Sequence, residues 1–307
     1  MPSRTDHLTV QATTITERLL RDWPLPGLTG SGKKSRGDVW VIGGARGTPG
    51  AAMLAGLAAL RVGAGRLTLA VAESVAVAVA VAVPESGVNP LPETMSGSVR
   101  GEVTAELAER LAGCDALLVG SGLDDAPQTA ALVQALLPVV SDHTTVVLDA
   151  YALGILPDVT EVADRWSGRL ILTPNTEELA RLLEVPAGQL DDPAALPGAV
   201  QYAAHRYGAV ITCHNVIADP AGSVWEAAPN CIGLGTSGSG DVLGGVVLGL
   251  LGRGAEPAQA GCWATYLHLT AGHRLTDKIG TVGFLAGELL SELPGLLDGC
   301  APPDTNS

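Results

Sequence analysis

The stretch Gly233-Leu-Gly-Thr-Ser-Gly-Ser-Gly-Asp-Val-Leu-Gly-Gly245 decides how the rest of the chain is interpreted. It is nearly half glycine and holds the single acid Asp241, after which an uncharged apolar run extends from Val242 to Leu251. A glycine- and serine-rich loop that leads into a helix points backbone N–H groups outward, where the positive helix end suits a phosphate. We therefore expect a phosphate loop with a built-in carboxylate. The alternative is that Asp241 is the N-cap of a core helix.

The bulk composition indicates an α/β protein. The chain has 307 residues, enough for one large α/β domain or two smaller ones. Hydrophobic residues make up 47% but aromatics only 3%, and such aliphatic sequences are typical of helices packed on a parallel sheet. The net charge of −14 argues against a general nucleic-acid binder, which normally shows a basic surface. It leaves open the binding of one nucleotide in a local pocket.

The spacing of the cysteines and the lack of a recognisable signal peptide indicate a reducing, aqueous compartment. The five cysteines are widely spaced and form no C-x-x-C pair, so neither a zinc site nor a disulfide scaffold is indicated. The polar residues 1–21 lack the apolar core of a signal peptide. The apolar run 75–84 is about half as long as a membrane-spanning helix. We expect a soluble cytoplasmic protein without a membrane partner.

Strand and helix patterns alternate beyond residue 36. Residues 38–44 predict a strand that ends on two glycines, 50–61 a helix of small residues, and 66–71 a second strand, which together form a βαβ unit. Further strands are predicted at 115–122, 144–149, 169–174, 209–212, 216–218 and 223–226, and helices at 101–114, 129–137, 175–183, 258–276 and 282–293. Glycines or acids end several of these strands. A ligand site at one edge of a single parallel sheet is therefore expected.

The order of the motifs resembles the ADP/ATP-dependent NAD(P)H-hydrate dehydratase family of the ribokinase-like superfamily. The matching pieces include Gly37-Asp-Val-Trp-Val-Ile-Gly-Gly44, Ala58-Ala-Leu-Arg-Val-Gly-Ala-Gly65, Gly120-Ser-Gly-Leu123, Leu148-Asp-Ala150 and Gly235-Thr-Ser-Gly-Ser-Gly-Asp-Val-Leu243. The resemblance spans roughly residues 30 to 295. It implies a single-domain ribokinase-like three-layer sandwich with a mostly parallel central sheet, with a lead-in at 1–35, the domain at 36–297 and a tail at 298–307.

The resemblance also bears on residues 73–83, where valine and alanine alternate. A period of two favours a strand, but both alternating residues are apolar, so the pattern says little about which face is buried. The corresponding stretch of the family is helical. We therefore expect a helix here.

The resemblance implies an enzyme that dehydrates hydrated NADH or NADPH, with ADP or ATP as co-substrate and Mg²⁺. The nucleotide phosphorylates the hydroxyl group on the hydrated ring, after which phosphate leaves and the double bond returns. Asp241 is expected to be the general base, and the amides of residues 237–240 are expected to stabilise the transferring phosphoryl group. We also expect a homo-oligomer that works with an NAD(P)H-hydrate epimerase.

The resemblance assigns three groups of binding residues. The residues expected to contact the hydrated cofactor are Ala51, Gly122, Asn175 and Asp241. The residues expected to contact the nucleotide are Ile211, Thr212, Cys213, His214, Asn215, Ser237, Gly238, Ser239 and Gly240. Glu178 is the candidate ligand for Mg²⁺.

The chain departs from the family pattern at four places. Asn175-Thr-Glu-Glu178 stands in place of His-Pro-Gly-Glu and resembles the Asn-x-x-Glu of the superfamily's kinases, in which the acid helps organise magnesium. A Lys-Gly pair falls on Ile211-Thr212, so a cation near the phosphates is lost, and Ile211→Lys is expected to tighten nucleotide binding. Tyr151 replaces the second acid of Asp-Ala-Asp-Ala-Leu. In Gly-Pro-Gly-Leu-Gly the proline is Ser121 and the last glycine is Asp124.

These departures keep two other functions open: a small-molecule kinase of the same superfamily, and a nucleotide-binding member without catalysis. Simpler interpretations also exist for single residues. Asn175 and Glu178 could cap a helix, and Asp149 could cap the helix after its strand. His268 and His273 lie five residues apart, so they do not predict a metal pair on one helix face.

Overall fold

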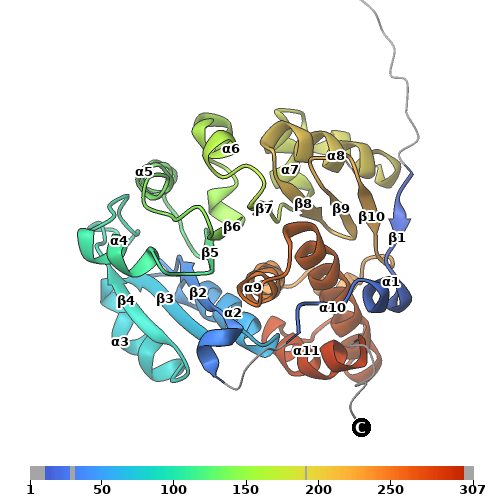
Figure 1. Cartoon of the computed structure of the whole chain (residues 1–307), viewed down its shortest axis with the longest axis horizontal. Helices are drawn as coiled ribbons and strands as arrows, with labels where there is room; N and C mark the ends of the chain where they lie inside the picture. The colour runs from blue at the N-terminus through green and yellow to red at the C-terminus, as the bar shows by residue number, and fades with distance from the viewer. Residues whose placement is uncertain (1–10, 28–31, 191, 301–307) are drawn as a thin grey trace, which may run out of the picture.

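The computed structural model describes residues 11–27, 32–190 and 192–300, and these form a single sheet between two layers of helices (Figure 1). This confirms the three-layer α/β sandwich expected from the sequence. Residues 1–10 and 28–31 of the expected lead-in, and 301–307 of the expected tail, lie outside the described residues. Within the described ranges, no helix has the length and apolarity needed to cross a membrane.

The sheet has ten strands in the order β1-β10-β9-β8-β7-β6-β5-β2-β3-β4. Their bounds are β1 Thr13–Thr14, β2 Asp38–Ile42, β3 Arg66–Ala72, β4 Gly87–Leu91, β5 Ala116–Val119, β6 Thr145–Leu148, β7 Leu170–Leu172, β8 Val210–Cys213, β9 Val216–Ala218 and β10 Val224–Glu226. Of these described strands, only β9 runs against the others, because it is antiparallel to both β8 and β10. The remaining neighbours pair in parallel.

The strand order reverses between β2 and β5. From β2 the chain adds β3 and β4 toward one edge, whereas β5 to β8 extend toward the other edge. In open parallel sheets, ligands bind outside the carboxyl ends of the strands at such a reversal point. The topology therefore directs attention to the segments that follow β2 and β5.

Helices cover both faces of the sheet. One face carries α2 Pro49–Arg61, α3 Glu73–Ala82, α9 Ser239–Gly252, α10 Pro257–Lys278 and α11 Ala286–Cys300. The other carries α4 Ala105–Leu111, α5 Ala126–Leu136, α6 Glu161–Arg165, α7 Thr176–Leu183 and α8 Leu196–Tyr207. Strand β2 is apolar from Val39 to Ile42 because both of its faces are covered. Val39 and Val41 pack toward the first layer, whereas Trp40 and Ile42 pack toward the second.

Helix α9 lies unusually close to α2 because two of its residues lack side chains. A Cβ atom at Gly245 would lie 2.1 Å from the carbonyl oxygen of Ala55, and one at Gly249 would lie 2.5 Å from that of Ala59. Any side chain at either position would collide with the α2 backbone. This close packing fixes the position of α9, and with it the glycine-rich loop at its start.

Residues before position 36 also belong to this fold. Strand β1 pairs with β10, and α1 Glu17–Asp22 follows with Thr16 as its N-cap. The carbonyl oxygen of Trp23 accepts hydrogen bonds from Gln259 (3.2 Å) and Trp263 (3.0 Å) on α10. The sheet therefore begins before the domain start expected from the sequence.

Some local expectations are confirmed and others are not. The alternating stretch is helix α3, as the resemblance implied, and Val77 and Val81 on it are each 78% exposed. The helix expected at 101–114 is shorter, because Thr104 is its N-cap. Strand β4 and helix α8 were not predicted. Pro90 lies within β4, and proline is tolerated there because β4 is an edge strand.

Candidate active site

Two glycine turns meet at the point where the strand order reverses. The backbone N–H of Gly44, after β2, donates to the carbonyl oxygen of Ser121, after β5, at 2.9 Å, and Ala45 donates to Gly122 at 2.8 Å. The hydroxyl group of Thr48 donates to the same Gly122 oxygen at 2.8 Å. These bonds hold both turns against the start of α2.

Ala51 and Gly122 lie beside each other, as the expected substrate set requires. Gly122 has a φ of +76°, and a Cβ atom there would lie 2.4 Å from the Thr48 carbonyl oxygen and 3.1 Å from the Ala51 Cβ. Only glycine fits this left-handed position so close to another backbone. The turn after β5 therefore presents bare backbone to the sheet edge.

Asp241 lies in the first turn of α9 but does not cap it. The N-cap of α9 is Gly238, which takes a left-handed φ of +89°. The capping alternative for Asp241 is therefore wrong. The Asp241 carboxyl group is half-buried, and this burial raises its pKa, while a hydrogen bond from the Ser121 side chain opposes the rise. A carboxylate with a raised pKa at the rim of a site suits general-base chemistry.

The loop before α9 has the features of an anion site. Because α9 begins at Ser239, the first amide N–H groups have no partners inside the helix. The Ser239 N–H donates to the Thr236 carbonyl oxygen, which leaves those of Gly240 and Asp241 for an anion. The left-handed turn at Gly238 brings the preceding loop to this helix end. The expected phosphate-contacting residues Ser237, Gly238, Ser239 and Gly240 thus lie together next to Asp241.

His268 on α10 supports this loop, and the sequence reasoning missed it. Its Nε2 atom lies 3.0 Å from both the hydroxyl and the carbonyl oxygen of Ser239. Burial lowers the pKa of His268 to about 4, so the ring is neutral at pH 7. The signal available in the sequence was a histidine placed between two leucines, Leu267 and Leu269. His273 instead contacts the Pro229 carbonyl oxygen.

Asp149 ends β6 and points into the protein rather than capping the next turn. Its Oδ1 atom accepts a hydrogen bond from Thr173 at 2.6 Å, and its Oδ2 atom accepts one from Ser121 at 3.1 Å. The 3₁₀ turn after it, Ala150–Ala152, has no side-chain cap bond, so the capping alternative is wrong. Burial, together with the nearby charges of Asp241 and Glu178, raises the pKa of Asp149 to about 7.

Asn175 and Glu178 form a capping box at the start of α7. The Asn175 Oδ1 accepts from the Glu178 N–H at 2.9 Å, and the Glu178 Oε2 accepts from the Asn175 N–H at 2.9 Å. The structure therefore realises the capping alternative for both residues. The Asn175 amide nitrogen takes no part in the box and is the atom that could face a ligand. Burial raises the pKa of Glu178.

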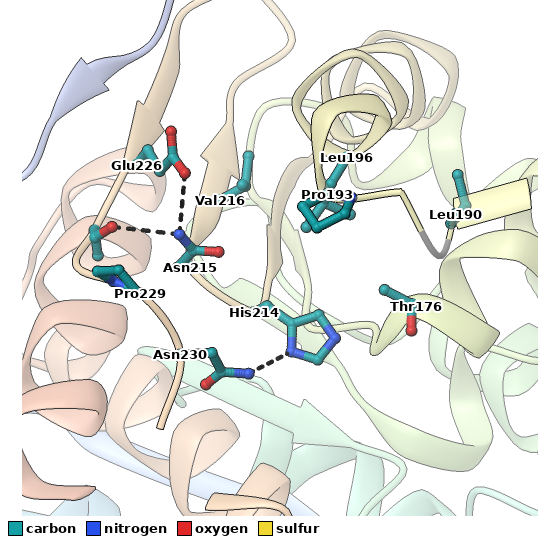
Figure 2. A pocket seen from close by; sticks show the side chains of 11 residues that line it. Thr176, Leu190, Pro193, Leu196, His214, Asn215, Val216, Glu226, Pro229 and Asn230 are labelled. Carbon is teal, nitrogen blue, oxygen red and sulfur yellow. Dashed lines mark hydrogen bonds between the residues drawn. The ribbon is translucent and has the colours of Figure 1, made fainter. Parts of the chain in front are cut away.

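A cavity of about 580 Å³ opens beside the turn between β8 and β9 (Figure 2). Its walls come from the α7–α8 region on one side and from the β8–β9 turn and the segment after β10 on the other. They comprise Thr176, Leu190, Pro193, Leu196, His214, Asn215, Val216, Glu226, Ala227, Pro229 and Asn230. His214, in a left-handed conformation, is bonded to Asn230 at 3.0 Å. Asn215 donates to Glu226 at 3.1 Å.

The expected nucleotide residues on β8 divide into two groups. His214 and Asn215 line the cavity. The side chains of Ile211 and Cys213 are fully buried in the core instead, and the Thr212 hydroxyl lies 2.8 Å from that of Thr265 on α10. A lysine at position 211 would therefore point into the core. The expectation that Ile211→Lys supplies a cation to the phosphates is wrong for that reason.

A second cavity, of about 360 Å³, lies where β5 and β6 end. Tyr151, which is 41% exposed, lines it together with Glu178 and Arg181 from α7. The sequence predicted no cavity here. Tyr151, which replaces an acid of the family pattern, and the cation Arg181 therefore both line a cavity at this edge of the sheet.

The described residues contain no group of three or more histidine, cysteine, aspartate or glutamate side chains arranged to bind a metal ion. All five cysteines are free and buried. Mg²⁺ commonly binds through one or two carboxylates together with phosphate oxygens and water. Glu178 fits that requirement as a single contributor, with its Oε2 atom already bonded in the capping box.

Known proteins resemble this chain along nearly its whole length. A family model described as NAD(P)H-hydrate dehydratase matches residues 39–295. The ADP-dependent (S)-NAD(P)H-hydrate dehydratase of Xanthomonas campestris is 41% identical over 93% of this chain and 96% of that protein. The bifunctional NAD(P)H-hydrate repair enzyme Nnr of Moorella thermoacetica is 38% identical over 89% of this chain and 52% of that protein.

A solved structure shares the fold. It is the ADP/ATP-dependent NAD(P)H-hydrate dehydratase of Bacillus subtilis, co-crystallised with ATP and Mg²⁺. Its TM-score to this chain is 0.75 at 27% sequence identity, over 93% of this chain and 97% of that one.

Proposed function

The chain belongs to the NAD(P)H-hydrate dehydratase family, and we propose that it uses ADP to return hydrated NADH and NADPH to their intact forms. One observation carries this proposal: the half-buried carboxyl group of Asp241 and the anion loop share one helix end, next to the bare turn at Gly122. A hydroxyl acceptor, a base and a phosphoryl group can meet there.

The residues have separate tasks in the proposed reaction. Ala51 and Gly122 offer a flat, close surface for the hydrated ring, and the Asn175 amide nitrogen adds a polar contact. Asp241 removes the proton from the ring hydroxyl as that oxygen attacks the terminal phosphate. The amides at the start of α9 stabilise the transferring phosphoryl group, which is mainly a task of positioning and charge. Loss of phosphate then restores the double bond.

We assign the nucleoside part of ADP to the cavity beside His214. Its polar wall atoms come from His214, Asn230 and Glu226, and its apolar floor comes from Leu190, Pro193 and Leu196. The chain runs directly from the cavity wall at Asn230 to the anion loop that begins at Gly235. A nucleotide with its base in the cavity could follow this segment toward Asp241. Mg²⁺ bound with the nucleotide would neutralise phosphate charge, with Glu178 as its contributor from the chain.

The second cavity suits the remainder of the dinucleotide. Tyr151 offers an exposed ring for stacking and Arg181 offers a cation for phosphate. Phosphate recognition by arginine and stacking on an aromatic ring are both common in nucleotide binding. We therefore place the adenylate half of the hydrated cofactor there.

We further propose that the chain acts in the cytoplasm, as a homo-oligomer, and alongside an NAD(P)H-hydrate epimerase. Five free buried cysteines fit a reducing compartment. Val77 and Val81 expose apolar surface on α3, which fits self-association. The Xanthomonas relative is named for the (S) hydrate alone, and the Moorella relative is bifunctional. An enzyme restricted to one epimer needs a second activity to convert the other.

The kinase and the inactive alternatives are not favoured. Asn175 and Glu178, the residues that suggested a kinase, are bonded to each other as a helix cap. The deciding experiment incubates purified protein with hydrated NADPH and ADP or ATP. Return of the dihydronicotinamide absorbance, together with AMP formation from ADP, supports the dehydratase. Phosphorylation of an alcohol without that absorbance would favour a kinase.

A further inference from the structure

The hydroxyl group of Ser121 lies between two carboxyl groups. It donates to the Oδ2 atom of Asp149 at 3.1 Å, and it lies close enough to Asp241 to lower the pKa of that carboxyl group. The negative charge of Asp241 lies near enough to raise the pKa of Asp149. Ser121 has a single hydroxyl proton and can donate it to only one carboxylate at a time.

Of the three groups, Ser121 and Asp149 are buried in the protein. Asp149 is only 4% exposed and Ser121 is fully buried, whereas Asp241 is half-buried at the site. Thr173 holds the other oxygen of Asp149 at 2.6 Å. Gly244, one turn after Asp241, leaves room for the carboxyl group, because a Cβ atom there would lie 3.1 Å from Oδ2. Only Asp241 of the pair can touch substrate.

The proposed reaction removes two protons in each cycle. The first leaves the ring hydroxyl when its oxygen bonds to the phosphoryl group. The second leaves the neighbouring ring carbon when phosphate departs with the electrons of its C–O bond and the C=C bond forms. After the first step Asp241 carries a proton, and in that state it cannot accept another.

We propose that Ser121 and Asp149 form a proton relay behind Asp241, which restores Asp241 as a base between the two steps. The proposal rests on the dehydratase function proposed above. Asp241 gives its new proton to the Ser121 oxygen as the Ser121 proton moves to Asp149. Asp241 is then an anion again, Ser121 is unchanged and Asp149 is neutral. Asp241 takes the carbon-bound proton and passes it to the departing phosphate, which leaves as HPO₄²⁻. The proton on Asp149 then returns through Ser121 to Asp241, which releases it to water, so that both carboxylates are regenerated.

The charges around Asp149 support its part as the acceptor. Asp241 on α9 and Glu178 on α7 face it, and their negative charges favour its neutral form, as does its burial. Its pKa is raised to about 7, so at neutral pH this carboxyl group can both accept a proton and return it. Ser121 and Asp149 act through Asp241 and are therefore positioning residues.

The sequence pattern explains why this relay is a property of this chain. The family pattern places proline where Ser121 stands, and proline has no hydroxyl group. A relay through this position is thus available here because Ser121 departs from that pattern.

The test separates the two chemical steps. In a single turnover with ADP, AMP formation reports phosphoryl transfer and the dihydronicotinamide absorbance reports the return of the double bond. In the wild type we expect the two signals to rise together. In Ser121→Ala and in Asp149→Asn we expect AMP to appear first, with the absorbance slowed on the order of 10²-fold. Ser86→Ala, which removes a half-buried hydroxyl outside the site, is the matched control.

A second readout distinguishes a relay from a packing effect. Below pH 7 Asp149 is increasingly protonated and cannot accept a proton, so the wild-type absorbance step should slow with falling pH. Asp149→Asn should lack this dependence, and Ser121→Thr, which keeps the hydroxyl, should restore concerted signals. Ser121→Ala with both signals at wild-type rates would overturn the relay, as would equal slowing of both signals with an unchanged pH profile. A wild type that forms neither product would instead overturn the proposed function.

Discussion

The Nε2 atom of His268 lies 3.0 Å from two oxygens of one residue, the hydroxyl and the carbonyl of Ser239, at the first residue of α9. A neutral imidazole with its proton on Nε2 can donate to either oxygen. The contact joins α10 to the anion loop and fixes the helix end that carries Asp241. Protonation of His268 would place a buried positive charge at this contact between α10 and α9.

Acid should therefore weaken the fold through His268. Its pKa is about 4 in the folded chain against an ordinary value of 6.5, so the unfolded chain binds the proton more readily. The contribution of the neutral ring is fully present above pH 6.5 and is lost as the pH falls toward 4, by roughly 3 kcal/mol in all. Urea unfolding at several pH values measures this loss. His268→Gln, without a titrating group, should show a flatter profile over that range, and an equal slope in both proteins would contradict the assignment.

Asp149→Asn should stabilise the protein, and more so at higher pH. The pKa of Asp149 is raised to about 7 in the folded chain from an ordinary value near 4, so its carboxyl group favours folding below pH 4. This contribution is lost as the pH rises through 7. An amide can still accept from Thr173 and donate to Ser121, without a buried charge. Denaturant unfolding at pH 5 and pH 8 should show the larger gain at pH 8, and a loss of stability at pH 8 would refute this account.

Asp241→Asn should keep the fold and nucleotide binding but lose turnover. Because Gly238 caps α9, the substitution removes no cap bond. An amide cannot take the hydroxyl proton, and positioned proton transfer contributes roughly 10²–10⁴ in rate. Melting temperature, ADP affinity and turnover should be measured on one preparation. Wild-type turnover in this variant would mean that Asp241 is not the base.

Ile211→Lys should destabilise the protein instead of tightening nucleotide binding. Ile211 is fully buried among apolar side chains, and an isolated ammonium group there must be neutralised or drawn out of the core. We expect a loss of about 3 kcal/mol or more in the free energy of unfolding, against about 0.5–1.5 kcal/mol for the control Ile211→Val. Urea unfolding makes the comparison. Unchanged stability with tighter ADP binding would restore the original expectation.

His214→Ala should weaken ADP binding with little change in the melting temperature. His214 lines the larger cavity and is bonded to Asn230, so its loss removes a wall of the proposed nucleoside site. A lost hydrogen-bonded contact of about 1.4 kcal/mol corresponds to a tenfold weaker Kd. His205→Ala, on α8 outside this cavity, is the control for calorimetric titration with ADP. Equal affinities in both variants would remove the nucleotide from this cavity.

The parts of the molecule that depend on local pattern were predictable from sequence. Aliphatic strands that end on glycines, as at Gly43 and Gly120, mark a parallel sheet with its site at the carboxyl edge, and the structure has this sheet. The glycine-rich loop and Asp241 were found for the same reason, since helix-start chemistry is encoded within a few residues.

The contacts that were missed join distant segments. Nothing near His268 in the sequence points to Ser239, and nothing near Asp149 points to Ser121. The side of the sheet on which the Ile211 side chain lies could not be predicted either. A fully buried strand is apolar on both faces, so its sequence does not say which side chains face the site. Strand β4 was missed because Asn89 and Pro90 interrupt its apolar pattern.

The pairing of β1 with β10 has a consequence for how the chain acquires its structure during synthesis. Thr13 and Thr14 are translated long before their partners Trp225 and Glu226, which follow the segments that form β2 to β9. The central parallel strands can associate in the meantime, whereas this edge must wait. Strand β1 is thus translated well before it can pair, and Trp23 reaches α10 only after that helix too has been translated. We therefore expect the outer edge of the sheet to form after the strands around the site have come together.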